Sequence, residues 1–220
     1  MTNSHRAHLS EAQEDYLKQV LLLSEGGPVT TQALAGRMGV RPASVTGMLK
    51  KLASLWLVDY APYRGVTLTE AGRAVALEVL RHHRLIETYL AEALGYDWDE
   101  VHAEAERLEH HISEAFEARI AEWLGHPERD PHGDPIPAPD LALPESHGRA
   151  LNDCPPGRYR LMRVRAQDQD TLALLARLGL VPGATFALLE RAPSGARVQA
   201  GEGRYLLPLE LARSLEVEPA

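Results

Sequence analysis

The chain has 220 residues, of which 45% are hydrophobic and 25% charged, as in an ordinary globular protein of one large domain or two to three small ones. It has no run of eighteen apolar residues and it starts with a polar segment, so we expect a cytoplasmic protein with neither a transmembrane helix nor an export signal. Its single cysteine, Cys154, excludes an internal disulfide and a multi-cysteine zinc cluster.

The net charge of −8 is concentrated in the middle third of the chain. Residues 1–75 carry 8 basic against 6 acidic side chains, residues 76–150 carry 6 against 17, and residues 151–220 carry 9 against 8. A segment with this excess of carboxylates repels nucleic-acid phosphate and attracts cations. The uneven charge therefore indicates separate places for an anionic and a cationic partner.

The first third has the pattern of a winged helix-turn-helix. Apolar residues recur at helical spacing over residues 11–25, and two short helices joined by a turn at Gly39 follow within residues 30–58. Two β-like runs, Leu57–Tyr60 and Val66–Thr69, then flank a Pro-Tyr-Arg-Gly tip. Helices followed by such a hairpin predict a DNA-binding domain with a wing.

The second short helix has the side chains expected of a recognition helix. Small or hydrogen-bonding residues at its start can approach base edges, and basic residues at its end and in the wing can reach phosphate or the minor groove. The expected DNA contacts are Arg41, Pro42, Ser44, Thr46, Lys50, Lys51 and Arg64. Since the recognition helix is poor in long side chains that read bases, DNA shape and thymine methyl groups should contribute. A purely structural or protein-binding winged helix is the alternative that this pattern leaves open.

The rest of the chain predicts two more helices, a connector and a β-rich end. We expect a long helix from Glu70 to about Ala93 and another that begins near residue 101 and ends near Leu124. Eight prolines between residues 126 and 157 predict an extended connector, because proline lacks a backbone donor. Short strands with one helix over residues 158–220 predict a small, partly open β-barrel of the SH3 kind.

Histidines and carboxylates share one face of the helix that begins near residue 101. At about 100° per residue, four of them fall within an arc of about 100°. They are His102, Glu106, Glu109 and His110. On the preceding helix, His83 and Glu87 stand four residues apart and face one way. A solvated acidic face is the simpler interpretation, but it does not require histidine at these positions, so the pattern favours a metal site.

Carboxylate and imidazole ligands without thiolate suit a relatively hard divalent ion, such as manganese or iron(II). Raw affinity would favour zinc or copper, so selectivity would depend on geometry and availability. Two other classes compete with a metal-responsive DNA-binding protein. A metalloenzyme would need a base or nucleophile beside an open coordination position, and the chain offers no separate motif for one. A small-molecule regulator would need an apolar pocket and no metal.

Six segments resemble, in order and spacing, the diphtheria toxin repressor family of metal-dependent bacterial regulators, which includes the manganese transport regulators. The segments are EDYLKQVLLL, RPASVTGMLKKL, YRGVTLTEAGR, RHHRLIETYL, VHAEAERLEHHIS and DPHGDPIP. The resemblance covers residues 10–140 and extends through the last 60 residues, which look like that family's SH3-like domain. It implies a non-enzymatic homodimer that binds a palindromic double-stranded operator and needs neither a membrane nor a small organic ligand.

The resemblance also implies a primary metal site, with one ligand from the first helix and three from the dimerisation domain. These ligands fall on Asp15, Glu106, Glu109 and His110. In the iron-responsive branch, methionine and cysteine stand where this chain has Asp15 and Glu106, so the two carboxylates resemble the manganese branch. Lys18 stands where regulators with a two-metal cluster have another acid, which implies two separate mononuclear sites.

The family's ancillary metal site falls on His83, Glu87 and His102. Polar residues of the SH3-like domain complete it in three-domain members, and alignment across the connector gives Asp168, with Asp170 behind it. Manganese is the implied metal and iron(II) the alternative, while zinc, cadmium or cobalt can be expected to bind in vitro.

We therefore expect a mainly α protein with small β parts. Its expected parts are a winged helix-turn-helix DNA-binding domain (1–75), a helical metal-binding and dimerisation domain (76–140), a Pro-rich connector (141–157) and an SH3-like β-barrel domain (158–220). The expected function is manganese-dependent repression of metal-uptake genes, in which bound metal fixes the domain orientation for operator binding.

Overall fold

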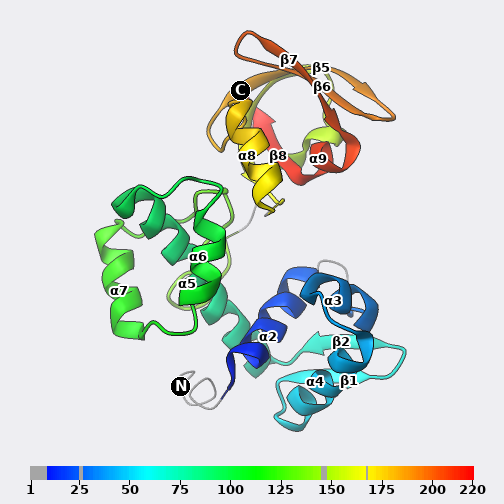
Figure 1. Ribbon diagram of the computed structural model, residues 1–220, viewed down its shortest axis with the longest axis vertical. Helices are drawn as coiled ribbons and strands as arrows, with labels where there is room; N and C mark the ends of the chain where they lie inside the picture. The colour runs from blue at the N-terminus through cyan, green and yellow to red at the C-terminus, as the bar shows by residue number, and fades with distance from the viewer. Residues whose placement is uncertain (1–8, 25–26, 145–147, 167) are drawn as a thin grey trace. The chain divides into compact units, whose positions relative to one another are not determined.

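The computed structural model describes residues 9–24, 27–144, 148–166 and 168–220 (Figure 1). The described residues form two compact units, the first from those up to residue 82 with 139–142 and the second from those of 83–138 and of 143–220. Among the described residues, no helix combines the length and the apolar character needed to cross a bilayer.

The first unit is a winged helix-turn-helix (Figure 1). Its elements are α2 (Glu11–Leu23), α3 (Thr31–Met38), α4 (Pro42–Ser54), β1 (Val58–Ala61), β2 (Gly65–Leu68) and the first half of α5 (Glu70–Leu94). The Thr30 hydroxyl caps α3 by accepting a hydrogen bond from the Ala33 N–H at 3.1 Å. Gly39 ends α3 with φ 65°, a left-handed conformation that favours glycine, and Pro42 occupies the first turn of α4.

The helices and the hairpin of the first unit enclose one apolar core. Val20 of α2, Leu34 of α3, Leu49 of α4 and Val66 of β2 are all fully buried in it. Leu141, from the short segment 139–142 that belongs to this unit, packs against the same core. Burial of one face of each helix leaves the opposite face of α4 to solvent, which is the arrangement that a recognition helix requires.

The helical part of the second unit differs from the sequence prediction in one respect. The single helix expected between residue 101 and Leu124 is wrong, because two helices occupy this stretch, α6 (Val101–Leu108) and α7 (Glu114–Trp123). Ser113 interrupts the helix since its hydroxyl accepts a hydrogen bond from the Phe116 N–H at 3.3 Å and starts α7 anew. Glu109 and the residue after it therefore lie in the turn that follows α6.

The C-terminal part of the second unit is an antiparallel six-stranded sheet. Its elements are β3 (Arg149–Ala150), the 3-10 helix η1 (Leu151–Asp153), β4 (Gly157–Val164), α8 (Gln169–Arg177), β5 (Thr185–Ala192), β6 (Gly195–Ala200), β7 (Gly203–Pro208), α9 (Leu209–Ser214) and β8 (Leu215–Pro219). The strand order is β3-β8-β4-β5-β6-β7. The mainly α fold with a small SH3-like β domain is confirmed, but the sheet is open and not a closed barrel, since its described ends, β3 and β7, each have one neighbour.

The proline-rich segment is more ordered than an extended connector. Residues 132–137 are buried within the second unit, and the short elements β3 and η1 stand inside the stretch expected to lack regular structure. The prolines remove backbone donors but leave carbonyl groups that accept hydrogen bonds, as Pro131 does from the Trp98 indole at 2.8 Å. This packing brings the DPHGDP motif against α5.

Trp56 supplies a test of backbone strain in the first unit. It has φ 60°, a left-handed conformation that destabilises a non-glycine residue. Its side chain is 83% exposed, so packing offsets little of this strain. We expect Trp56→Gly to raise the free energy of unfolding by about 0.5–1 kcal/mol, because relief of strain exceeds the added entropy of the unfolded chain. Urea unfolding followed by circular dichroism measures the change.

The neighbouring Leu55 provides the matched control for this substitution. It is also exposed, but it has φ −92°, so glycine relieves no strain there and should lower the stability. Equal destabilisation by Trp56→Gly and Leu55→Gly would contradict the strain assigned to Trp56.

Candidate metal centre and nucleic-acid interface

Three predicted ligands of the ancillary site meet between α5 and α6. The Nε2 atom of His83 lies 2.9 Å from Glu87 Oε1 and 3.1 Å from His102 Nδ1. The His102 Nδ1 atom in turn lies 2.9 Å from the same carboxylate oxygen. Ligands about 2.1 Å from an ion and at right angles to one another are about 3 Å apart, so this triangle of atoms fits a divalent cation.

The second oxygen of Glu87 faces a group that the sequence prediction missed. Glu87 Oε2 and His132 Nδ1 lie 3.7 Å apart, and both are buried without a hydrogen-bond partner among the described residues. Asp130 completes a set of three buried ligand groups with them. Asp130 and His132 belong to the segment DPHGDP, whose prolines indicate a connector, so the sequence pattern does not predict them as ligands.

The tautomer of His132 explains why this pair of atoms suits a cation. Its Nε2 lies 3.0 Å from the Trp98 carbonyl oxygen and donates to it, since a carbonyl can only accept. In the neutral ring, Nδ1 then presents a lone pair to the Glu87 carboxylate, and two electron-rich atoms repel each other unless a proton or a metal ion lies between them. A histidine that donates its other N–H to a backbone carbonyl is a common metal ligand.

The ionisation of this buried cluster follows from the Glu87 carboxylate. Burial alone would raise the pKa of Glu87, but the charge on His83, the hydrogen bonds with His102 and His83, and the nearby His132 hold this pKa well below its usual range. Burial alone would lower the pKa of His132, whereas Glu87 and then Asp130 raise it to about 9. Glu87 is thus an anion that favours the protonated form of the neighbouring histidines. A divalent ion therefore competes with the proton for the Nδ1 atom of His132.

Asp130 has the opposite electrostatic environment. Burial, and then the charges of Glu87 and Asp134, raise the pKa of Asp130 well above its usual range, while Arg84 and His132 oppose this shift. Carboxylates crowded together in this way favour binding of a cation, because the ion relieves their mutual repulsion. The residues present therefore fit a divalent metal.

The ligands predicted for the primary site adjoin the same cluster through His83. Its Nδ1 atom lies 2.5 Å from Glu109 Oε2 and 3.8 Å from Glu106 Oε1. The His110 Nε2 atom lies 3.3 Å from the other oxygen of Glu109. Glu109 and His110 lie in the turn after α6, whereas the Glu106 carboxylate lies with His83 and His102, 3.8 Å from a ring nitrogen of each. The fourth predicted ligand, Asp15, lies on α2 in the first unit.

Asp168 is the residue that precedes and caps α8, Asp170 lies in its first turn, and both are exposed. The Asp168 carboxylate accepts a hydrogen bond from the Thr171 N–H at 3.0 Å. Hydrogen bonding with the Thr171 side chain, and then with this N–H, lowers the pKa of Asp168. Neither residue belongs to any ligand group formed by the described part of the chain. The structure therefore gives Asp168 the role of a helix cap, and its proposed role at the ancillary site stays a prediction.

The residues predicted to contact DNA lie on the exposed side of α4 and on the wing. Thr46 is partly exposed and the other six are exposed, namely Arg41, Pro42, Ser44, Lys50, Lys51 and Arg64. Val45, Leu49 and Leu52 form the buried side of the same helix. Tyr63, which was not predicted, is fully exposed beside Arg64 at the tip of the wing, where an aromatic ring can reach a groove of DNA.

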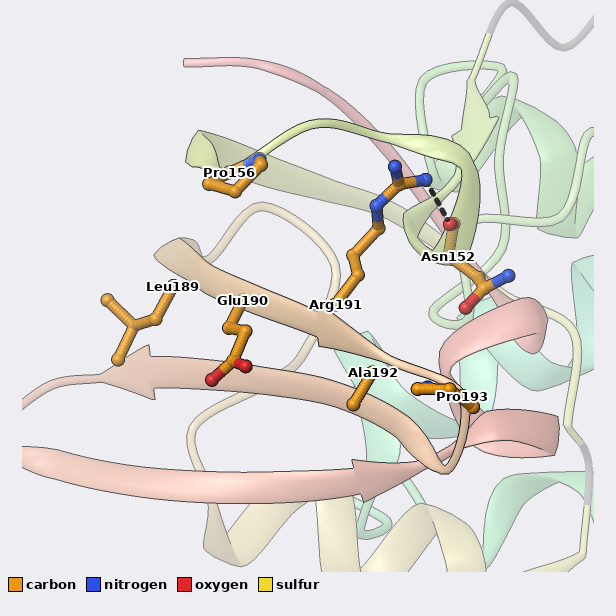
Figure 2. Close-up of a pocket in the computed structure, with 7 residues that line it drawn as sticks. All are labelled: Asn152, Pro156, Leu189, Glu190, Arg191, Ala192 and Pro193. Carbon is orange, nitrogen blue, oxygen red and sulfur yellow. Dashed lines mark hydrogen bonds between the residues drawn. The ribbon is translucent and has the colours of Figure 1, made fainter.

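A pocket of ≈ 480 Å³ lies in the C-terminal domain between η1 and β5 (Figure 2). Figure 2 shows Arg191 donating to the backbone carbonyl of Asn152, a hydrogen bond of 2.9 Å. The lining contains one acid, one base and no imidazole or thiol, so the pocket has no set of metal ligands.

Comparison with known protein families matches almost the whole chain. Residues 8–66 match the N-terminal DNA binding domain of iron dependent repressors, and residues 69–138 match their metal binding and dimerisation domain. Residues 149–219 match the FeoA domain. The three matches follow one another in the order expected for a three-domain metal-dependent regulator.

Individual relatives point to the same group of proteins. The iron-dependent repressor IdeR of Mycobacterium tuberculosis (strain H37Rv) is 33% identical over 226 residues, which span 96% of this chain and 98% of IdeR. A solved manganese-dependent transcriptional repressor in complex with manganese is 37% identical, with a TM-score of 0.86 over 94% of this chain and all of that one. ScaR with bound Zn²⁺ is 34% identical, with a TM-score of 0.84 over 94% and 99% of the two chains. These relatives are regulators, which sets aside the metalloenzyme interpretation.

The two roles considered for Asp168 can be separated by two substitutions. Asparagine caps helices as well as aspartate does, whereas alanine does not. We expect Asp168→Ala to lower the free energy of unfolding by about 1 kcal/mol in metal-free buffer, and Asp168→Asn to leave it unchanged. Chemical denaturation in the presence of a chelator measures both, and equal losses would contradict the capping role.

The same Asp168→Asn variant also tests the ancillary-ligand prediction, because it removes a carboxylate while it keeps the cap. Weaker manganese binding, measured by calorimetry, is the expected result if Asp168 is a ligand. Unchanged affinity would leave capping as the role of this residue.

Proposed function

Because the chain belongs to the family of metal-dependent repressors that includes IdeR and the diphtheria toxin repressor, we propose that it is a manganese-dependent repressor of metal-uptake genes. As a homodimer it binds operator DNA, and the proposed operator is palindromic, since a two-fold protein matches two half-sites. The observation that carries the proposal is the convergence of imidazole and carboxylate ligands on Glu87 and His83, in a chain that also has an exposed recognition helix.

The proposed primary metal site consists of Asp15, Glu106, Glu109 and His110. Contacts within the second unit support it, since His110 lies 3.3 Å from Glu109, and His83 lies 2.5 Å from Glu109 and 3.8 Å from Glu106. The fourth ligand comes from α2 of the DNA-binding unit. A metal that binds all four therefore favours the orientation of the two units in which the ligands can meet.

The proposed consequence of this favoured orientation is tighter DNA binding. If it spaces the two recognition helices of the dimer about one turn of DNA apart, bound metal raises operator affinity. Without metal, Glu106 and Glu109 repel each other and Asp15 is released from them. Coupling of this kind is typically worth about 5- to 150-fold in affinity.

A second metal position is proposed at Glu87, with two possible ligand sets on its two oxygens. Oε1 faces His83 and His102, as the family resemblance implies, and Oε2 faces His132 and Asp130. The second set is supported by its two buried atoms without hydrogen-bond partners, which a cation would satisfy. We therefore propose that Asp130 and His132 bind the second metal together with Glu87.

Manganese is proposed over iron(II) because the ligands are hard. No thiolate is available among the described ligand groups, and Cys154 is buried in the core of the C-terminal domain. The names of relatives include both iron-dependent and manganese-dependent repressors, so iron(II) is the alternative. Operator binding titrated with manganese, iron(II) and zinc in parallel distinguishes them. Activation by iron(II) at a lower free concentration than by manganese would favour the alternative.

Asp15 is the residue whose removal tests the proposed coupling most simply. We expect Asp15→Ala to reduce the metal stimulation of DNA binding from about 5- to 150-fold to within about twofold of none, while the dimer stays intact. Fluorescence anisotropy with a selected DNA fragment measures binding, and sedimentation measures the dimer. Unchanged metal dependence would refute the assignment of Asp15.

Glu104 is the matched control, since it lies on α6 among the same acidic residues but pairs with Arg107 and belongs to no ligand group of the described chain. Glu104→Ala should keep the full metal response. If Glu106→Ala abolishes the response but Asp15→Ala does not, the metal site lies within the second unit alone and the proposed coupling between units is wrong.

A further inference from the structure

The loop Asp130–Pro135, which we call the ligand loop, is packed directly on the C-terminal domain. The His132 carbonyl accepts a hydrogen bond from the Val164 N–H of β4 at 2.9 Å. Gly133 lies so close to β4 that a Cβ at this position would stand 2.0 Å from the Met162 carbonyl oxygen. Backbone contact of this kind excludes side chains between loop and strand, so movement of β4 also moves the loop.

The internal hydrogen bonds of the ligand loop fix its shape. Asp130 Oδ1 accepts from the His132 N–H at 2.8 Å and from the Asp134 N–H at 2.9 Å. These two bonds leave Asp130 Oδ2 to face the rest of the cluster, 3.6 Å from Arg84 Nε. The loop is therefore a small rigid unit that carries two of the proposed metal ligands, Asp130 and His132.

A chain of charged side chains joins this loop to both sides, and its carboxylates, Asp134 and Glu216, are buried. Asp134 Oδ1 lies 3.3 Å from Arg84 Nη2 of α5 and also pairs with Arg163 Nη2 of β4. Arg163 Nη1 lies 3.4 Å from Glu216 Oε1 of β8, and the Arg165 Nε donates to the same oxygen at 2.6 Å. The buried carboxylate of Asp134 thus pairs with Arg84 of the helical part and with Arg163 of the C-terminal domain.

We propose that Arg163 is a positioning residue for the second metal: through Asp134 it holds the ligand loop so that Asp130 and His132 face Glu87. Arg163 has no place in the proposed ligand set and acts through Asp134. The proposal rests on the second metal position proposed above. It implies that metal binding at Glu87 and docking of the C-terminal domain strengthen each other, because linkage between two equilibria is reciprocal.

Manganese binding by the full-length protein, followed by calorimetry in metal-free buffer, tests this inference. The wild type should show two classes of site, of which His132→Ala removes the second and Asp15→Ala the first. Arg163→Met should weaken the second class about 10- to 100-fold, as loss of a supporting contact does, and leave the first class unchanged. Arg163→Lys, which keeps the charge, should recover part of the affinity.

Arg160→Met is the matched control. Arg160 lies on the same strand, is more than half exposed and pairs with Glu218 at 3.9 Å, whereas Arg163 pairs with Asp134. Its substitution should leave the manganese affinity of both classes of site unchanged. If Arg163→Met leaves the second class unchanged, weakens both classes equally or has the same effect as Arg160→Met, the positioning role is overturned.

A double-mutant cycle and a docking measurement complete the test. In the background of His132→Ala, Arg163→Met should cause no further loss of manganese affinity, because the two residues act on one site. Hydrogen exchange of β4 amides should slow on addition of manganese in the wild type but not in Arg163→Met, and equal slowing in both would overturn the proposal.

If the wild type binds no manganese at all, the proposed function itself fails. If it binds manganese and DNA normally while Arg163 has no effect, only this inference fails.

Discussion

The structure depends on one buried carboxylate, that of Glu87. Removal of an ionised carboxylate from water costs several kcal/mol, so the chain must supply positive charge or hydrogen bonds around it. Two histidines reach one of its oxygens, and His132 of the ligand loop faces the other. The helices α5 and α6 and the ligand loop therefore meet at a single anionic centre. An arrangement that needs cations to offset its own charge is suited to sensing a divalent ion.

This centre connects parts of the chain that would otherwise be independent. His83 contacts Glu87 on one side and Glu109 on the other, so the two proposed metal positions share a neighbour. On the opposite side of Glu87, Asp134 of the ligand loop pairs with Arg163 of β4, which in turn pairs with Glu216 of β8. Under the proposed function, metal occupancy would thus act on the DNA-binding unit through the primary ligands and on the C-terminal domain through Arg163.

Local features of the sequence predicted much of the fold and some of the site. The caps and turns at Thr30, Gly39 and Pro42 mark the helix ends of the DNA-binding domain, and they act through short-range hydrogen bonds and backbone angles. The pair His83 and Glu87 could be found because residues four apart share a helix face. Asp130 and His132 could not, since long-range packing buries them within a proline-rich stretch. Helical periodicity also failed beyond Leu108, where a serine cap divides the predicted helix in two.

The central claim is that metal binding and DNA binding are two sides of one equilibrium, and reciprocity tests it most directly. Manganese affinity should be measured with and without a saturating DNA fragment recovered by selection from random sequences on the manganese-loaded protein. If the two are linked, DNA tightens manganese binding by the same factor by which manganese tightens DNA binding, about 5- to 150-fold. A manganese affinity that is the same with and without DNA would contradict it.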